Sequence, residues 1–177
     1  MERKEYERVS PESLGIPSKS IQDMVDRLEK VTEMHSIMIQ RHGKICAEGW
    51  WAPYAPGIPH GLQSLTKTYA STAVGIAFTR GELSLDEKLV DLFPEYLLES
   101  VDENLRKLTI YHVLSMTNGM DECNLGGADW INKYFAAPVN HEPGTQFFYN
   151  TAGSGMLGVI IKRKTGRSLE QYLKGRL

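Results

Sequence analysis

The spacing of apolar residues near the N-terminus predicts a polar arm followed by one helix. Residues 1–17 are mostly polar and end in Gly-Ile-Pro, which is typical of an extended segment. After them, apolar residues recur every three or four positions, at Ile21, Met24, Val25, Leu28 and Val31. This spacing predicts a helix from Ser18, which acts as its N-cap, to about Thr32. The arm and this helix occupy residues 1–35.

The pattern then changes to two short β-prone runs, residues 36–41 and 44–48, which are separated by His42-Gly43. A short connection that contains glycine between two such runs predicts a β-hairpin over residues 36–48. A lone hairpin is marginal in water, and the rest of the chain offers no other convincing strand. We therefore expect self-association or partner binding through an exposed sheet edge.

Residues 49–63 are rich in Gly, Pro and aromatic residues and predict a loop. For Trp50 and Trp51 in this loop, we favour packing beneath it over contact with a substrate.

From residue 64 onward the pattern is helical. A long apolar stretch predicts a helix from Ser64 to Thr79, which Arg80-Gly81 ends. Shorter helices are predicted at 86–92, at 110–115 behind Thr109, near Trp130, at 152–164 before Gly166, and from Ser168 with Gln171 at capping-box spacing. One hairpin followed by many helices predicts an α+β fold. A length of 177 residues fits one domain, residues 1–177, with residues 64–177 as its helical region.

Composition and charge exclude several function classes. The chain is 41% hydrophobic and 24% charged, which is typical of a soluble globular protein rather than a disordered one. The net charge is −2 and no stretch concentrates Lys and Arg, so we expect no nucleic-acid partner. No run of about 18 apolar residues exists that would span a membrane. The charged N-terminus lacks the apolar core of a signal peptide, so we expect a cytoplasmic protein.

Cysteine and histidine placement gives no sign of a metal site. The two cysteines, Cys46 and Cys123, lie far apart and form neither a disulfide framework nor a CxxC pair. The five histidines are scattered without metal-ligand spacing. We expect no metal and no other cofactor.

Residues 63–67 read QSLTK and contain the spacing S-x-x-K. If Ser64 opens a helix, Lys67 lies one turn later on the same face, so its amine reaches the serine oxygen. The positive end of the helix stabilises negative charge that develops near that oxygen. A serine is a weak nucleophile and needs such help. The motif alone is weak evidence, because a chain of this length contains about one S-x-x-K by chance, and a helix cap followed by a solvated lysine explains the same letters.

Four blocks around this motif make the chain resemble a known family. They are residues 63–68 (QSLTKT), 81–96 (GELSLDEKLVDLFPEY), 108–120 (LTIYHVLSMTNGM) and 143–151 (PGTQFFYNT). In order and spacing they resemble class C β-lactamases and the penicillin-binding proteins and esterases related to them. The resemblance covers roughly residues 10 to 177. It departs from the family at Met116, where a histidine is common, and at Asn118, where a serine is common.

The resemblance implies roles for further residues. Tyr149 would be the general base or its hydrogen-bond partner, although its ordinary pKa near 10 is too high for ionisation at neutral pH. A nearby Lys67 cation would favour the phenolate, and the two groups would share protons as a coupled pair. The family motif Y-x-N has Thr151 at its third position here. Thr151 and the neighbouring Asn150 are the candidate substrate-binding residues, and a partly buried core tyrosine is the alternative for Tyr149.

The resemblance also implies a function and a missing part. The function would be that of a serine hydrolase acting on an ester, an amide or a β-lactam through an acyl-enzyme on Ser64, with an esterase favoured over a β-lactamase and a D,D-peptidase third.

The triplet at residues 164–166 (KTG) matches the family's third motif in letters, but it ends a helical pattern, so we interpret it as a helix end. The true third motif, with the second oxyanion donor, is expected beyond Leu177, so the isolated chain would be weakly active or inactive. The alternative is a truncated or non-catalytic module that acts in assembly or binding.

Overall fold

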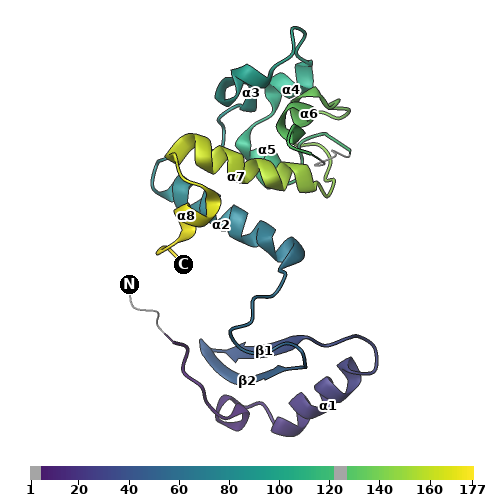
Figure 1. The fold of residues 1–177 in the computed structure, drawn as a ribbon, viewed down its shortest axis with the longest axis vertical. Coiled ribbons are helices and arrows are strands. Elements are labelled where there is room, and N and C mark those ends of the chain that lie inside the picture. Colours follow the sequence, from purple (N-terminus) through teal and green to yellow (C-terminus); the bar gives the residue numbers. More distant parts are fainter. Residues whose placement is uncertain (1–4, 122–126) are drawn as a thin grey trace. The chain divides into compact units, whose positions relative to one another are not determined.

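The computed structural model describes residues 5–121 and 127–177 (Figure 1), so Cys123 lies outside the described residues. The chain forms two compact units, Met1–Gly61 and Leu62–Leu177. The prediction of a single domain over residues 1–177 stays a prediction.

The first unit consists of a short 3-10 turn η1 (Pro11–Leu14), the helix α1 (Ser18–Leu28), and the strands β1 (Ser36–Arg41) and β2 (Lys44–Trp50). Helix α1 begins at Ser18 as predicted, but Pro17 stands at the N-cap, and the Ser18 amide donates to the Glu12 carboxylate at 2.8 Å. It ends at Leu28 rather than Thr32. A further turn would include the β-branched residues Val31 and Thr32. Because Val31 is 79% exposed, burial would add little stability to that turn.

The predicted hairpin is confirmed and runs slightly further than expected. The strands β1 and β2 pair antiparallel from Ser36↔Trp50 to Arg41↔Lys44. The connecting residues, His42 and Gly43, both have positive φ, the conformation that two-residue hairpin turns of type I′ require.

The N-terminal arm is not a free extended segment. The amide of Val9 donates to the carbonyl of Ile45, and the amide of Ile45 donates to the carbonyl of Glu7, so the arm pairs in parallel with β2 at Arg8. This part of the β2 edge is therefore covered. Self-association through a sheet edge stays a prediction.

The second unit carries the helices around one core (Figure 1). After the 3-10 turn η2 (Gln63–Leu65), they are α2 (Thr66–Thr79), α3 (Leu89–Leu92), η3 (Pro94–Tyr96), α4 (Glu103–Lys107), α5 (Ile110–Leu114), α6 (Trp130–Ala136), α7 (Thr151–Thr165) and α8 (Leu169–Leu173). Helices α2, α5 and α8 all pack against α7. The contact face of α2 is small, with Ala70, Ala73, Val74 and Ala77 buried at helical spacing, so the two long helices approach closely.

The predicted helix ends agree with the structure where the sequence contains a recognisable capping residue. Thr109 with His112, and Ser168 with Gln171, form capping boxes, and Gly166 ends α7 in the left-handed conformation. The KTG triplet is therefore a helix end, as predicted, and Lys164 forms an ion pair with Glu87 at 2.7 Å.

In the second unit, two helix starts were predicted wrongly and one helix was missed. Ser64 lies in a 3-10 turn before α2 instead of opening it, α3 begins at Leu89 rather than Asp86, and α4 was not predicted. Helix α4 has five residues and one buried side chain, Leu105, so its sequence shows no repeating spacing of apolar residues that would predict a helix. Its start is fixed by Asp102, whose carboxylate accepts from the amides of Asn104 and Leu105.

A loop after α5 holds the segment that precedes α7. The amide of Phe148 donates to the carbonyl of Met116, the amide of Gly144 to that of Thr117, and the amide of His141 to that of Gly119. Gly119 has φ +77, and a Cβ added there would lie 2.1 Å from the carbonyl oxygen of His141. Only glycine allows this approach, and the register of the segment ending at Tyr149 depends on it.

We expect Gly119→Ala to lower the free energy of unfolding by about 2–3 kcal/mol or more, because strain at positive φ adds to a backbone clash. Urea unfolding followed by circular dichroism measures the loss. Gly81→Ala is the matched control, since Gly81 has φ +69 but nothing lies within 4 Å of the added Cβ. Equal losses in the two variants would contradict the role given to the Gly119–His141 approach.

Candidate active site

Ser64 and Lys67 lie at the start of α2 on one face. Ser64 is the middle residue of η2 and is exposed, and Lys67 follows in the first turn of α2. The ammonium Nζ of Lys67 donates to Ser64 Oγ at 3.2 Å. The S-x-x-K spacing thus brings the amine to the serine oxygen, although a 3-10 turn replaces the expected first turn of α-helix.

Tyr149 reaches the same oxygen from a distant part of the chain. Its hydroxyl donates to Ser64 Oγ at 2.7 Å across 85 residues. Tyr149 stands two residues before α7 and is 51% exposed, so it is not the buried core tyrosine of the alternative interpretation. Three candidate catalytic side chains therefore meet at one atom, and their roles in a reaction stay a prediction.

The surroundings of Tyr149 favour its ionised form. Hydrogen bonds with Lys67 and with Ser64 lower the pKa of Tyr149 below its ordinary value near 10, and they outweigh desolvation, which raises it; the positive charge of Lys67 adds a smaller lowering effect. The Lys67 ammonium also lies 4.9 Å from the centroid of the Tyr149 ring. A phenolate formed here is an acceptor for the Ser64 hydroxyl, because a hydroxyl hydrogen rotates to suit its partner.

The two candidate substrate-binding residues differ in exposure. Asn150 is 3% exposed, and its Oδ1 accepts from the amide of Gly153 at 2.6 Å, so it is the N-cap of α7. Thr151 is the exposed first residue of α7. In the part of the chain that the structure describes, no hydrogen bond joins either residue to Ser64, Lys67 or Tyr149. A substrate-binding role for them stays a prediction.

Two supporting features were not found from the sequence. Gln63, directly before the serine, has φ +47, and Met116, whose carbonyl holds Phe148, has φ +56. Residues other than Gly, Asn and Asp rarely have positive φ, so the residue types at these two positions do not predict this conformation. Backbone of this kind is found at sites where the surroundings fix one conformation.

Within residues 5–121 and 127–177, no three His, Cys, Asp or Glu side chains are grouped to hold a metal ion. The same residues contain no helix with the length and hydropathy needed to cross a membrane.

The sequence model of the Beta-lactamase family matches residues 22–177. The chain belongs to this family. It is 28% identical over 129 residues to Esterase EstB from Burkholderia gladioli, with 61% of this chain and 33% of that protein covered. It is 31% identical over 122 residues to Penicillin-binding protein 4 from Amycolatopsis lactamdurans, with 64% of this chain and 32% of that protein covered.

Solved structures give the same fold. The crystal structure of a Beta-Lactamase/D-Alanine Carboxypeptidase from Pseudomonas syringae superposes with a TM-score of 0.71 at 25% identity, covering 90% of this chain and 48% of that one. A class C β-lactamase in complex with cefoxitin gives a TM-score of 0.72 at 23% identity, covering 90% and 48%. The fold is thus the expected α+β, β-lactamase/transpeptidase-like one. The family member described here spans about a third of the length of these curated relatives and about half of the solved chains.

Variants of Asn150 distinguish its structural role as a helix cap from a role in substrate binding. We expect Asn150→Ala to cost about 1 kcal/mol of unfolding free energy, and Asn150→Ser to cost little, because serine replaces the capping oxygen. Thermal unfolding measures both losses. A serine variant that is as stable as the wild type but loses substrate affinity would assign a binding role to the amide.

Proposed function

We propose that the protein is a serine acyl hydrolase in which Ser64 forms an acyl-enzyme. The observation that carries this proposal is the convergence of Tyr149 and Lys67 on Ser64 Oγ. A serine becomes a useful nucleophile when a base accepts its proton and a third group holds that base. Tyr149, with its lowered pKa, fits the base, and Lys67 fits the group that stabilises the phenolate.

The proposed reaction has two halves. In the first, Ser64 Oγ bonds to the substrate carbonyl carbon while its proton passes to the Tyr149 oxygen, and the carbonyl oxygen becomes an anion near the N-terminus of α2. The anion collapses, the bond to the leaving group breaks, and Tyr149 returns the proton to the leaving group. In the second half, water repeats the sequence, and the acid and free Ser64 are released.

We rank a carboxylic ester above a β-lactam as the substrate, and a D,D-peptide third. The esterase among the relatives supports the first place, and the exposed Thr151, which replaces an amide by a hydroxyl, supports weaker recognition of an amide substrate. The chain spans about a third of the length of these relatives, so the activity of the whole protein is itself part of the proposal.

The first test is covalent labelling. Incubation with a fluorophosphonate probe should add one probe mass, localised to Ser64 by peptide mass spectrometry, and Ser64→Ala should abolish it. We expect Tyr149→Phe to slow labelling by about 100-fold or more, since it removes the base. Labelling that persists in Ser64→Ala, or an unlabelled wild-type chain, contradicts the proposal. A parallel incubation with a nitrophenyl ester and a chromogenic cephalosporin ranks the substrate classes.

The second test uses pH. The phenolate is the reactive form, so the labelling rate should rise with pH and level off above the pKa of Tyr149, which lies below that of an ordinary tyrosine. Lys67→Met removes the hydrogen bond and the charge that lower this pKa, so the rise should move to higher pH.

Lys174→Met is the matched control, because it removes an ammonium on α8's C-terminal flank, and its pH profile should coincide with that of the wild type. A Lys67→Met profile with the wild-type midpoint would show that Lys67 does not set the ionisation of the base.

A further inference from the structure

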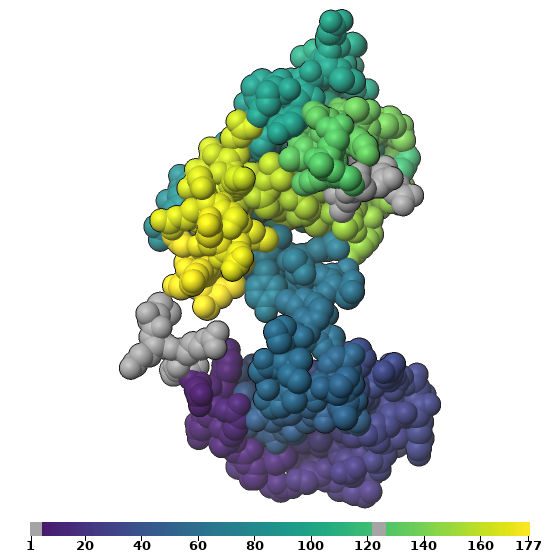
Figure 2. Space-filling view, viewed as in Figure 1, coloured from purple at the N-terminus to yellow at the C-terminus, as the bar shows by residue number. Residues whose placement is uncertain are grey.

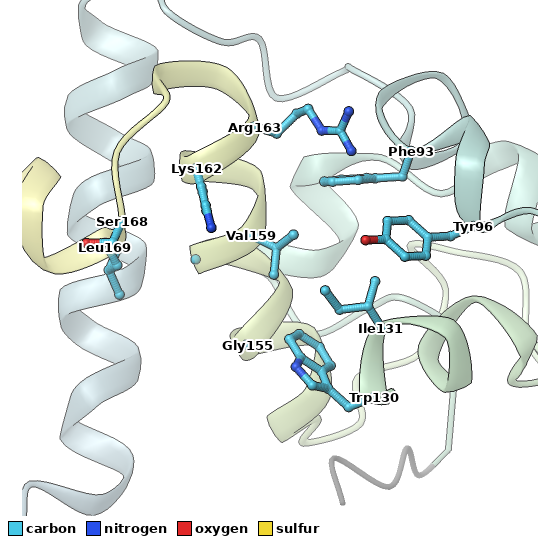
Figure 3. A pocket seen from close by; sticks show the side chains of 11 residues that line it. Phe93, Tyr96, Trp130, Ile131, Gly155, Val159, Lys162, Arg163, Ser168 and Leu169 are labelled. Atoms are coloured by element: carbon cyan, nitrogen blue, oxygen red, sulfur yellow. The ribbon is translucent and has the colours of Figure 1, made fainter. Parts of the chain in front are cut away.

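A groove of about 660 Å³ lies along α7, outside the site around Ser64 (Figure 3). Its lining includes Tyr96, Trp130, Ile131, Val159, Lys162 and Leu169. The segments on its two sides, around α6 and α8, lie on the same face of the second unit (Figure 2). Its size falls within the range of about 300–1,000 Å³ that is usual for small-molecule sites.

The floor of the groove is apolar. Trp130 and Ile131 come from α6, Val159 from α7 and Leu169 from α8. Gly158 adds space, since an added Cβ there would meet only Leu169 Cβ, at 4.0 Å. An apolar body in this groove would replace water over aromatic and aliphatic surface.

Lys162 and Tyr96 carry hydrogen-bond donors on the walls, and neither donor has an acceptor within the described residues. The Lys162 ammonium makes no hydrogen bond and no ion pair there, and the Tyr96 hydroxyl makes none. Tyr96 is held in place by stacking on Phe135, with ring centroids 5.8 Å apart and planes 8° apart. In Figure 3 both side chains project toward the groove, with Val159 between them.

The neighbouring cation is engaged already. Arg163 pairs with Glu95 and lies 4.8 Å from the centroid of the Phe93 ring. Lys162 is exposed and has no ion-pair partner among the described residues, so it supplies a positive charge beside an apolar floor, and this arrangement complements one negative charge on an apolar molecule.

We propose that this groove binds an amphipathic carboxylate, with an acyl or aryl body on the floor and the carboxylate on Lys162. The site is separate from Ser64 and does not rest on acyl-enzyme chemistry. Its ligand class is that of a free carboxylic acid with an apolar chain.

The test is calorimetric titration of the Ser64→Ala chain with decanoate, decanol and decyltrimethylammonium below their aggregation limits. Binding is measured in this variant so that covalent labelling of Ser64 and occupancy of the groove succeed or fail independently. We expect decanoate to bind about tenfold or more tightly than decanol, and the cation to bind most weakly.

Variants assign the binding to the groove. Lys162→Met keeps the length of the stem and should reduce decanoate affinity to that of decanol. Gly158→Leu fills the floor and should weaken all three probes, while Lys174→Met should change none. Unfolding curves of each variant verify that it is folded.

Equal affinities for decanoate and decanol, unchanged decanoate affinity in Lys162→Met, or no binding at millimolar decanoate would each overturn the proposal. Sedimentation velocity tests whether a second copy of the chain occupies the groove. A dimer that Gly158→Leu dissociates would assign the groove to a second copy of the chain instead, and would likewise overturn the proposal.

Discussion

The close packing of α2 against α7 is the constraint on which the candidate site depends. Helix α2 carries Lys67 in its first turn, just after Ser64, and α7 begins two residues after Tyr149. The alanine-rich face of α2 lets the helices approach, and the buried face of α7 supplies the larger side chains Met156, Ile160 and Ile161. The 2.7 Å contact between Tyr149 and Ser64 is therefore a local result of burial spread along both helices.

The residues of this site differ in how well the sequence alone predicts their positions. Ser64 and Lys67 are three residues apart, so helical geometry alone predicts their contact. Tyr149 is 85 residues away, and no period or spacing in one chain reports a contact at that distance. Its place came from resemblance to a family. Asn150 became a candidate binding residue through the same resemblance, and that role stays a prediction, while the structure shows that it is the N-cap of α7.

Local fold was predicted where one residue type decides it. His42-Gly43, Thr109, Gly166 and Ser168 each fix a turn or a cap through their own backbone or side chain. The positive φ of Gln63 and Met116 was not predicted, because both are residue types that rarely adopt it. The pairing of the arm with β2 was missed for a similar reason. It is made by backbone groups of Glu7 and Val9, and any non-proline sequence offers those groups.

That pairing bears on how the molecule is handled at the bench. Residues 7–9 behave as a third, short strand, so the first unit does not begin at α1. A deletion that trims the chain to Ser18 would leave the Ile45 amide and carbonyl without these partners and open a backbone edge to neighbouring chains. A fusion tag joined directly at Glu7 would crowd the same edge. Expression vectors that keep the natural residues ahead of Glu7, or that place the tag at the other terminus, leave the strand intact.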